Sequence, residues 1–588
     1  MIKYLKYLSH YWWQVLLLFA GLSVQVWSAL QLPDMMSQIV NKGIVGGDQD
    51  FIMGEGILML LVALAGGAGM LIAGFFASRV GSGLARDVRE EVFKKTMNFS
   101  ISEISKFSTS SLITRTTNDV MQIQMVTILV LRMSCQAPLM GVGAILKALD
   151  TAPGMSWIIM LAVALLLMLV VSVIVVAVPK FKLLQKLIDK VNLVTRENLS
   201  GLRVVRAFNN ETHEEKKFDA ANKELTRVNL FVSRVMVVTF PIVQLILNFT
   251  TLMVIWFGAG LIDSGAIEIG NMMAFMQYAM QVMMSFMFLM MAFIMVPRAM
   301  VSWQRITEVL NTPLSIKSAA KSKNAKTAQR GTVEFRGVSF KYPGAEESVL
   351  KDVSFIAKAG QTTAFIGSTG SGKSTLINLV PRFYDATAGQ VLVDGVNVRD
   401  YNQKELVRKI GFVPQKGVLF SGTVSSNIAF GSAGLSKKQI REAARVAQAQ
   451  DFVEKLDHQF ESHIAQGGAN VSGGQKQRLS IARAVAKNPE IYIFDDSFSA
   501  LDFRTDLALR EALKPATKNA AVLIVAQRVG TIKHADQIVV LDKGRVVGVG
   551  THQKLLKSCA VYREIAASQL GDDELKAPLK VAKERANG

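Results

Sequence analysis

The residues best suited to binding or catalysis lie in a glycine-rich stretch at residues 367–375, which reads Gly-Ser-Thr-Gly-Ser-Gly-Lys-Ser-Thr. It matches the phosphate-loop pattern G-x-x-x-x-G-K-[ST] and stands between a strand-like run and a helical pattern. In that context glycines let backbone N–H groups surround phosphate oxygens, and the helix N-terminus adds positive potential. An unliganded glycine-rich turn is the weaker alternative. The expected nucleotide-binding residues are Gly367, Ser368, Thr369, Gly370, Ser371, Gly372, Lys373, Ser374 and Thr375.

Two of these side chains have specific expected roles. Lys373 should reach the β- and γ-phosphates, and the Ser374 hydroxyl should bind Mg²⁺. A buried-strand run at 491–495, Ile-Tyr-Ile-Phe-Asp, ends in a second magnesium candidate, Asp495. Residues 471–475 read Val-Ser-Gly-Gly-Gln, which places a hydroxyl and backbone donors at an expected helix N-terminus. That arrangement predicts an anion site.

The elements that must position these residues belong to the second half of a chain of 588 residues, which is too long for one core. Half of the residues are hydrophobic and the mean hydropathy is +0.30. The first half contains apolar runs of the length that a membrane helix needs, about 20 residues. The six predicted spans cover residues 12–32, 56–77, 126–146, 157–178, 235–261 and 271–296.

Charge predicts the orientation of these spans. The connections at 79–125 and 180–234 are long, helical in pattern and rich in Lys and Arg, whereas the other three are short and mostly acidic. The positive-inside rule places the two long connections, and both termini, in the cytoplasm. Segments that flank apolar spans therefore explain much of the net charge of +20. This distribution argues against a nucleic-acid-binding protein.

Polar residues recur on one face of each of the last two spans. A polar stripe within hydrocarbon faces either a helix bundle or a watery cavity. Bonding between helices and a substrate path are equally compatible with the pattern. The sixth span is also dense in methionine, which suits surfaces that bind varied apolar molecules. The candidate cavity residues are Gln244, Asn248, Thr251, Gln277, Gln281 and Ser285.

Together these motifs resemble the ABC exporter superfamily, in the form of a half-transporter. The resemblance implies an all-α six-helix transmembrane domain (1–310), a linker (311–330), a cytoplasmic α/β P-loop ATPase domain (331–570) and a polar tail (571–588). Residues 112–120 and 197–208 resemble the intracellular loops that, in this family, carry coupling helices to an ATPase domain.

The resemblance also implies further roles, with ATP and Mg²⁺ as cofactors. Tyr342 would stack on adenine, and Gln415, at the end of Gly-Phe-Val-Pro-Gln, would touch Mg²⁺ and sense the membrane domain. Residues 499–502 resemble the D-loop and residues 521–528 the switch strand. The signature residues would serve the γ-phosphate held by the opposite subunit; they are Ser472, Gly473, Gly474 and Gln475.

The chain departs from the family pattern at the γ-phosphate. Asp496 stands where the family usually has the glutamate that activates water, and Gln527 stands where it usually has histidine. Gln466, ahead of the signature, is a weaker departure. A carboxylate about 1 Å out of place can cost about 10²-fold in rate. Glutamine carries no proton or charge. We therefore take Asp496, Gln527 and Gln415 as the catalytic candidates of a degenerate site.

Such a combination resembles one chain of a heterodimeric bacterial multidrug exporter in a plasma membrane. The expected partner is a second half-transporter that has the glutamate after its Walker B aspartate, the position of Asp496 here, and the histidine at the position of Gln527. The expected substrates are hydrophobic or amphiphilic compounds. A homodimeric lipid or peptide exporter, and a membrane-anchored ATP-binding regulator that transports nothing, are the alternatives.

Overall fold

The computed structural model describes residues 7–319, 330–432 and 434–569. The chain forms two compact units. A helical unit comprises residues 1–97 and 109–312, and an α/β unit comprises residues 98–108 and 313–588. Half of the predicted linker, residues 320–329, and all of the predicted C-terminal tail lie outside the described residues.

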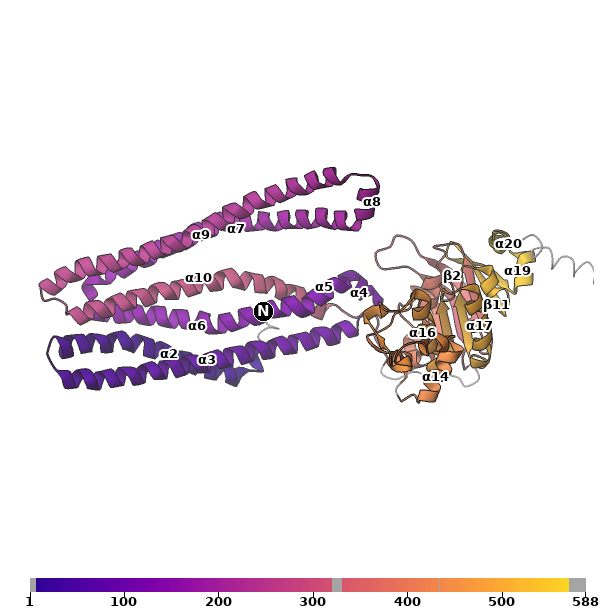
Figure 1. Cartoon of the computed structure of the whole chain (residues 1–588), viewed down its shortest axis with the longest axis horizontal. Helices are drawn as coiled ribbons and strands as arrows, with labels where there is room; N and C mark the ends of the chain where they lie inside the picture. The colour runs from indigo at the N-terminus through magenta and orange to yellow at the C-terminus, as the bar shows by residue number, and fades with distance from the viewer. Residues whose placement is uncertain (1–6, 320–329, 433, 570–588) are drawn as a thin grey trace, which may run out of the picture. The chain divides into compact units, whose positions relative to one another are not determined.

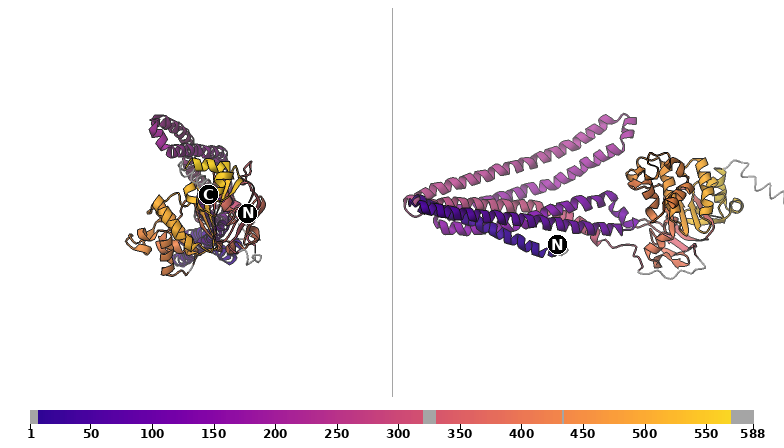
Figure 2. Two further views of the ribbon diagram at one scale, coloured as in Figure 1. Left: turned by 90° about the vertical axis from the view of Figure 1, so that its right-hand side faces the viewer. Right: turned by 60° about the horizontal axis from the view of Figure 1, so that its bottom comes forward.

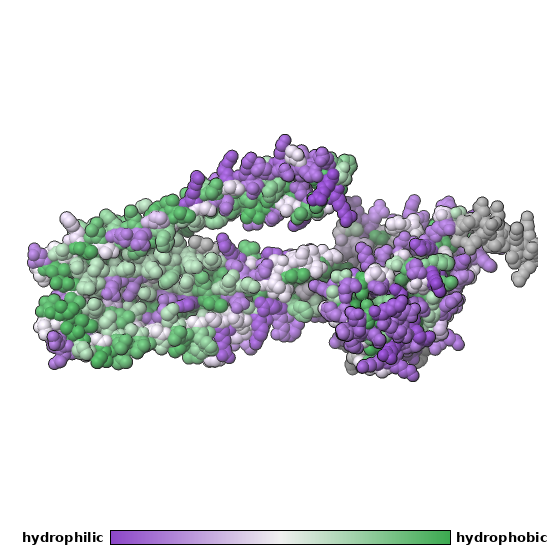
Figure 3. Space-filling view, in the orientation of Figure 1, coloured by the Kyte–Doolittle hydropathy of each residue, from purple (hydrophilic) through white to green (hydrophobic). Residues whose placement is uncertain are grey.

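The helical unit is built from long helices that run well beyond the apolar stretches. Within the described residues, six helices are long and apolar enough to cross a membrane, and each contains one predicted span. Large apolar side chains cover much of their outer surface (Figure 3). In chain order the elements are α2 (Trp12–Gln38), η1 (Ile39–Ile44), α3 (Gln49–Met97), α5 (Thr109–Thr114), η2 (Arg115–Asp119), α6 (Val120–Thr151), η3 (Pro153–Met155), α7 (Ser156–Ser200), α8 (Leu202–Ala207), α9 (Glu211–Asp263) and α10 (Ile269–Asn311).

Glycine brings α2 and α3 into close contact. A Cβ atom on Gly21 would lie 2.8 Å from the Gly69 carbonyl oxygen, and one on Gly69 would lie 2.6 Å from that of Gly21. Small residues at facing positions are how membrane helices approach closely, because lipid gives them no hydrophobic drive to associate.

The helices separate into two groups. Helices α2, α3, α6 and α10 lie together, whereas α7 and α9 pair with each other. This pair diverges from the other four helices toward the end that carries α8 (Figures 1 and 2). None of the six residues of α8, all of which the structure describes, is buried. The apolar side chains of Leu202 and Val204 are exposed there, as is Phe208 just after it.

A buried ionic cluster joins η2 to the end of α10. Arg115 donates to Glu308 Oε2 at 2.8 Å, and Asp119 Oδ1 accepts from the Ser302 hydroxyl at 3.0 Å. Arg115 and Asp119 are both buried. Buried charges are tolerated only when they are paired, so this cluster holds η2 and the end of α10 in one arrangement.

The α/β unit contains a six-stranded sheet in the order β12-β11-β3-β10-β9-β6 and a four-stranded antiparallel sheet in the order β2-β1-β4-β5. In the larger sheet all pairs are parallel except β11 with β12. The strands are β1 (Val333–Phe340), β2 (Leu350–Ala357), β3 (Thr362–Gly367), β4 (Ala388–Val393), β5 (Val396–Asn397), β6 (Ile410–Val413), β7 (Gly422–Thr423), β8 (His463–Ile464), β9 (Ile491–Asp495), β10 (Ala521–Val525), β11 (Gln537–Asp542) and β12 (Arg545–Gly550).

Several helices of this unit pack against the larger sheet, and α4 belongs to the unit although it precedes all of its strands in the chain. The helices are α4 (Ile101–Phe107), α11 (Lys373–Asn378), η5 (Val398–Asp400), α12 (Gln403–Arg408), α13 (Val424–Ile428), η6 (Ala429–Gly431), α14 (Lys437–Val446), α15 (Gln450–Val453), η7 (Gln459–Glu461), η8 (Gln466–Gly468), α16 (Gly473–Ala486), α17 (Phe503–Ala516), α18 (Val529–Ile532), α19 (His552–Ser558) and α20 (Ala560–Ala567).

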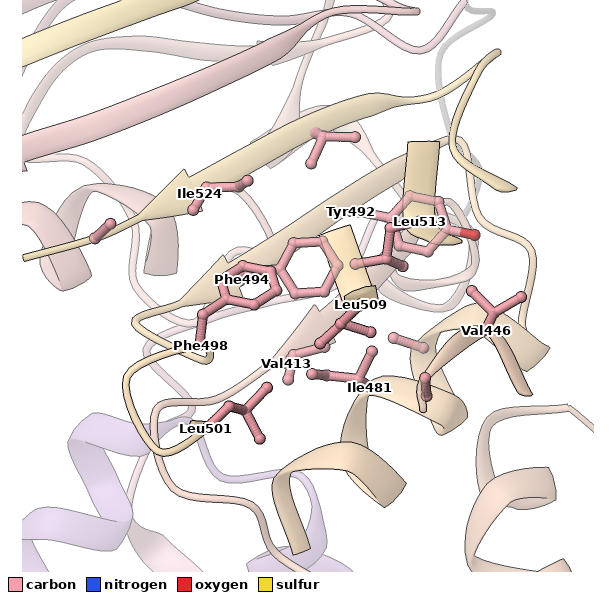
Figure 4. Close-up of a cluster of buried hydrophobic side chains, with 14 of the residues drawn as sticks. Val413, Val446, Ile481, Tyr492, Phe494, Phe498, Leu501, Leu509, Leu513 and Ile524 are labelled. Atoms are coloured by element: carbon pink, nitrogen blue, oxygen red, sulfur yellow. The ribbon is translucent and has the colours of Figure 1, made fainter. Parts of the chain in front are cut away.

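Strand β9 shows that the six-stranded sheet is buried on both faces. All five of its residues are buried. Tyr492 and Phe494 point into the cluster beneath α16 and α17, shown in Figure 4, while Ile491 and Ile493 belong to the cluster on the other face. This alternation follows from the two-residue period of a strand, and a run that is apolar on both faces is typical of a covered parallel sheet. The acidic end of β9 therefore emerges from a rigid core.

Candidate nucleotide site

The phosphate loop has the predicted strand–loop–helix setting. Strand β3 ends at Gly367, and α11 begins at Lys373. Gly370 and Gly372 have φ angles of +81° and +97°, which favour glycine. A side chain at Gly367 would lie 2.0 Å from the Leu541 carbonyl oxygen. These constraints explain the two pattern glycines, Gly367 and Gly372, and the additional Gly370, and they fix the path of the loop.

The Lys373 ammonium lies inside this loop. It donates to the carbonyl oxygens of Gly367 and Ser368, both at 2.8 Å. Burial lowers the pKa of Lys373, and the carboxylates of Asp496 and Asp495 oppose that shift. A partly desolvated cation in a ring of backbone groups is suited to bind a phosphate, which would replace the carbonyl contacts with charge-assisted ones.

Asp495 and Ser374 form the other side of the site. The Ser374 hydroxyl donates to Asp495 Oδ1 at 2.8 Å. Burial raises the pKa of Asp495, the nearby Asp496 adds to this shift, and the Ser374 hydrogen bond opposes it. A hydroxyl beside a buried carboxylate offers hard oxygen ligands, so these two residues fit a magnesium ion.

Asp496 lies at the centre of the site in an unusual backbone conformation. Its φ angle is +47°, and its N–H donates to the Val525 carbonyl oxygen at 3.0 Å. One carboxylate oxygen, Oδ2, accepts from Gln527 Nε2 at 2.8 Å and from Gln415 Nε2 at 3.3 Å. Burial raises the pKa of Asp496, whereas the two amide donors lower it. The three catalytic candidates, far apart in sequence, thus meet at one oxygen atom.

These groups surround a cavity of about 330 Å³. The predicted residues that line it come from the phosphate loop, the 411–415 motif, the end of β9 and the switch strand. Sequence reasoning missed Val349, an isolated valine that belongs to no motif, and did not single out Val525 within the switch strand; both line the cavity. The lining residues are Val349, Thr369, Gly370, Gly372, Lys373, Ser374, Thr375, Gln415, Asp496, Val525 and Gln527.

Tyr342 is tied to this site through its hydroxyl, which shares a hydrogen bond of 2.9 Å with Thr375 Oγ1. Its ring packs edge-on against Phe340 and Tyr384, with centroid distances of 4.8 and 5.3 Å. The ring is half-buried and is absent from the cavity lining. It is therefore held beside the phosphate loop in a fixed orientation.

The signature residues form a separate exposed site at the start of α16. Ser472 accepts from the Gln475 N–H, and the Gln475 side chain accepts from the Ser472 N–H at 2.9 Å. This capping box leaves the Gly473 N–H at the helix end. None of the residues from Ser472 to Gln475 is among those that line the phosphate-loop cavity of the same chain.

The polar stripes of α9 and α10 have different environments. Gln244 and Asn248 are exposed and bond to each other at 3.3 Å, and Thr251 bonds to the Leu247 carbonyl oxygen of its own helix. Gln277 is also exposed.

In contrast, Gln281 donates to the Ala29 carbonyl oxygen of α2 at 2.8 Å. Ser285 is buried and bonds to the Val282 carbonyl oxygen of its own helix. For these two residues the structure shows helix packing.

Comparison with known proteins identifies the family. A model described as the ABC transporter transmembrane region matches residues 15–286, and one described as ABC transporter matches residues 350–499. The chain belongs to the ABC transporter family. It is 41% identical to an uncharacterized ABC transporter ATP-binding protein of Mycobacterium tuberculosis (strain CDC 1551 / Oshkosh) over 549 residues, which cover 93% of this chain and 94% of the relative.

Two other comparisons relate the chain to exporters. It is 33% identical over 530 residues to the ATP-dependent lipid A-core flippase of Pseudomonas aeruginosa, covering 89% of this chain and 86% of the relative. The structure of a bacterial Atm1-family ABC exporter with ATP bound superposes with a TM-score of 0.79 at 24% identity, covering 95% of this chain and 98% of the other. The fold is therefore that of an ABC exporter, with a six-helix transmembrane domain followed by an ATPase domain.

Proposed function

We propose that this ABC exporter chain is the degenerate-site subunit of a heterodimer that exports hydrophobic or amphiphilic compounds across a bacterial plasma membrane. In this proposal both termini are cytoplasmic, and the domains follow the boundaries given above. The observation that carries it is the contact of Asp496 Oδ2 with the side-chain amides of Gln527 and Gln415.

Asp496 is poorly suited to activate water. Its carboxylate is one methylene shorter than the family's glutamate, and one of its oxygens is already occupied by two amide donors. Gln527 donates a hydrogen bond but takes up no proton, so it supplies no positive charge at the γ-phosphate. Both changes should slow hydrolysis at this chain's own phosphate loop.

The remaining groups favour retention of ATP binding. The Lys373 ammonium lies in the loop that would hold the phosphates, and Ser374 and Asp495 suit Mg²⁺. Gln415 lines the same cavity as Lys373 and Ser374. When bound, Mg²⁺ would neutralise charge between the β- and γ-phosphates. Tyr342 would stack on adenine. A site that binds ATP but hydrolyses it slowly would stabilise the closed pair of ATPase domains.

The exposed signature and α8 support a second subunit. Ser472, Gly473 and Gly474 present donors away from their own cavity, which suits the γ-phosphate of a partner's site. The exposed apolar residues of α8 would be costly to leave in water and suit a surface of that partner. The partner would contribute the glutamate and the histidine that this chain lacks.

The substrate class is inferred from the exposed face of α10. Gln277, Met280, Met284 and Met291 are exposed and lie within about 60° of one another around the helix, given 100° per residue. Flexible methionines beside an amide suit amphiphiles of varied shape. Gln244, Asn248 and Thr251 of α9 are the other cavity candidates.

A lipid substrate is the second candidate. The Pseudomonas relative, 33% identical, is named as a lipid A-core flippase. An assay with fluorescent amphiphilic dyes and one with labelled phospholipid, run on the same proteoliposomes, would separate the two substrates. Gln277→Ala with Met280→Ala should lower transport of the true substrate at least about fivefold, the effect of about 1 kcal/mol of lost contacts. Met160→Ala, an exposed methionine of α7, is the matched control.

The decisive test is ATPase activity in lipid, with this chain alone and then with the half-transporter encoded next to it. We expect little activity alone, high activity together, and loss when the partner's Walker B glutamate is changed to glutamine. Strong activity of this chain alone would establish a homodimer. Asp496→Asn in the assembled transporter should leave most turnover intact, whereas complete loss would also contradict the degenerate site.

A further inference from the structure

A polar network joins three helices of the helical unit at the end where α2 leads into α3 and α9 leads into α10. The Ser37 hydroxyl donates to Asn271 Oδ1 at 2.7 Å. Asn41 Nδ2 donates to the same oxygen at 3.1 Å, and the Gly270 N–H donates to Asn41 Oδ1 at 2.7 Å. Nearby along α2, Asp34 pairs with Lys147 of α6 at 2.9 Å. We call this set, Asp34, Ser37, Asn41, Lys147, Gly270 and Asn271, the end latch.

A π-helix places Asn41 in this network. In η1 the backbone hydrogen bonds span five residues instead of four, such as that from the Val45 N–H to the Val40 carbonyl oxygen at 3.0 Å. A π-turn shifts the helix face that follows it, and such turns occur frequently at functional positions. Ser37 and Asn41, four residues apart, both face Asn271.

Gly270 fits this contact by size. A Cβ atom there would lie 2.4 Å from the Ser37 carbonyl oxygen and 2.6 Å from Asn41 Oδ1. No larger residue fits without moving backbone, so the first turn of α10 lies directly against α2.

The contact continues inward along α10. Tyr278 donates to the Leu30 carbonyl oxygen at 2.9 Å, and Gln281 donates to that of Ala29. Ala274, which lies between Gly270 and Tyr278 on this face, is fully buried. The end latch is therefore the outermost part of one continuous contact between α2 and α10.

We propose that the end latch is the closure that keeps the transport path sealed at the end of the helical unit where α10 begins, and that it breaks when ATP turns the path outward. This rests on the proposed transport function. Alternating access is largely the rocking of one group of helices against another. A typical side-chain hydrogen bond makes only a small net contribution, because water offers the same groups other partners when the contact opens, so the closure is reversible.

The test is labelling of a single cysteine, Ala274→Cys in a Cys135→Ser background. A membrane-impermeant maleimide is added outside right-side-out vesicles that hold the assembled transporter. Without nucleotide, labelling should be slow, and a trapped ATP state should speed it. Asn41→Ala and Asn271→Ala should each raise the nucleotide-free rate at least about fivefold, the change expected from about one net hydrogen bond. Asn41→Asp keeps the acceptor for the Gly270 N–H and should have the smaller effect.

Ser264→Ala is the matched control, because the exposed Ser264 hydroxyl bonds to the Leu261 carbonyl oxygen at the end of the preceding helix, α9. A change no larger than that of this control for both Asn41→Ala and Asn271→Ala would overturn the latch.

A covalent closure gives an independent outcome. A Ser37→Cys and Asn271→Cys pair, once oxidised, should abolish the ATP-dependent increase in labelling, and reductant should restore it. An increase that persists in the cross-linked protein would also overturn the proposal. Absence of any ATP effect in the parent protein would contradict the transport function instead, while the nucleotide-free comparison would still decide the latch.

Discussion

The Gln527 amide donates to Asp496 Oδ2 at 2.8 Å, so the two residues that depart from the family pattern at the γ-phosphate contact each other directly. A carboxylate accepts from an amide without exchanging a proton with it. The two side chains are therefore joined by a hydrogen bond across which no proton is transferred. Gln415 adds a second donor to the same oxygen.

Restoring the family's residues should change hydrolysis at this site in steps. Asp496→Glu alone should give a modest gain, because its longer side chain must displace an amide that now lies 2.8 Å from the shorter one. Asp496→Glu with Gln527→His should raise turnover about 10²-fold. It should also introduce a pH dependence near 6.5, the usual pKa of histidine.

ATP turnover with the partner's catalytic glutamate changed to glutamine measures this effect, since the partner's site is then silent. Additive single effects in this double-mutant cycle would show that Asp496 and Gln527 are independent.

Asp495→Asn should stabilise the nucleotide-free ATPase domain. Burial raises the pKa of Asp495, so the folded state binds its proton more tightly than the unfolded state. This contribution favours folding below the ordinary pKa of about 4 and is lost as the pH rises through the raised value. At pH 7.5 the neutral asparagine should therefore raise Tm by roughly 2–4 °C per kcal/mol recovered. The gain should shrink as the pH falls toward 4.

Thermal melts with and without Mg-ATP check this prediction. The variant should lose most of the Mg-ATP shift that the parent shows, because its amide is a poor replacement for a magnesium-binding carboxylate. A lower Tm without nucleotide would contradict the stated cost of the buried charge.

Lys373→Met should weaken ATP binding by about 10- to 100-fold, the range for charge-assisted hydrogen bonds worth about 1.5–3 kcal/mol. The methionine side chain is apolar and similar in length to that of lysine, so the loop should keep its fold, although the carbonyl oxygens of Gly367 and Ser368 lose a donor. Binding of a fluorescent ATP analogue to the assembled transporter, with the partner's site blocked, is the measurement. Lys351→Met, at an exposed pair with Glu347, should leave the affinity unchanged.

Val204→Asp on α8 should leave the thermal stability of this chain unchanged, because Val204 is 61% exposed. It should lower the ATPase activity of the assembled transporter several-fold, since a charge there would disrupt the apolar contact that we propose between α8 and the partner. Asn222→Asp, at an exposed position of α9, is the control for one added negative charge. Equal activity of the two variants would show that α8 plays no part in coupling.

Much of this architecture was predictable because it depends on local pattern. Six apolar stretches predicted six helices, and the phosphate-loop glycines predicted the turn between β3 and α11. In contrast, the contact of Asp496 with Gln415 and Gln527 depends on strand order, which brings β9 between β6 and β10.

The π-helices η1 and η2 could not be predicted from the sequence either. Their turns are stabilised by tertiary partners more than 180 residues away, such as Asn271 for Asn41 and Glu308 for Arg115. The resemblance of residues 112–120 to an intracellular loop carried no prediction for the Arg115 side chain, and its burial follows from packing against α10.

Helix α10 is held at one end by η1 through Asn41 and at the other by η2 through Arg115. With 43 residues it is about 65 Å long, at about 1.5 Å per residue. Tilting such a rod by about 5° about one end moves the other end by roughly 5–6 Å, which exceeds the reach of a hydrogen bond. Leverage of this kind means that a small rotation where α10 leaves the helical unit is enough to separate Asn271 from Ser37.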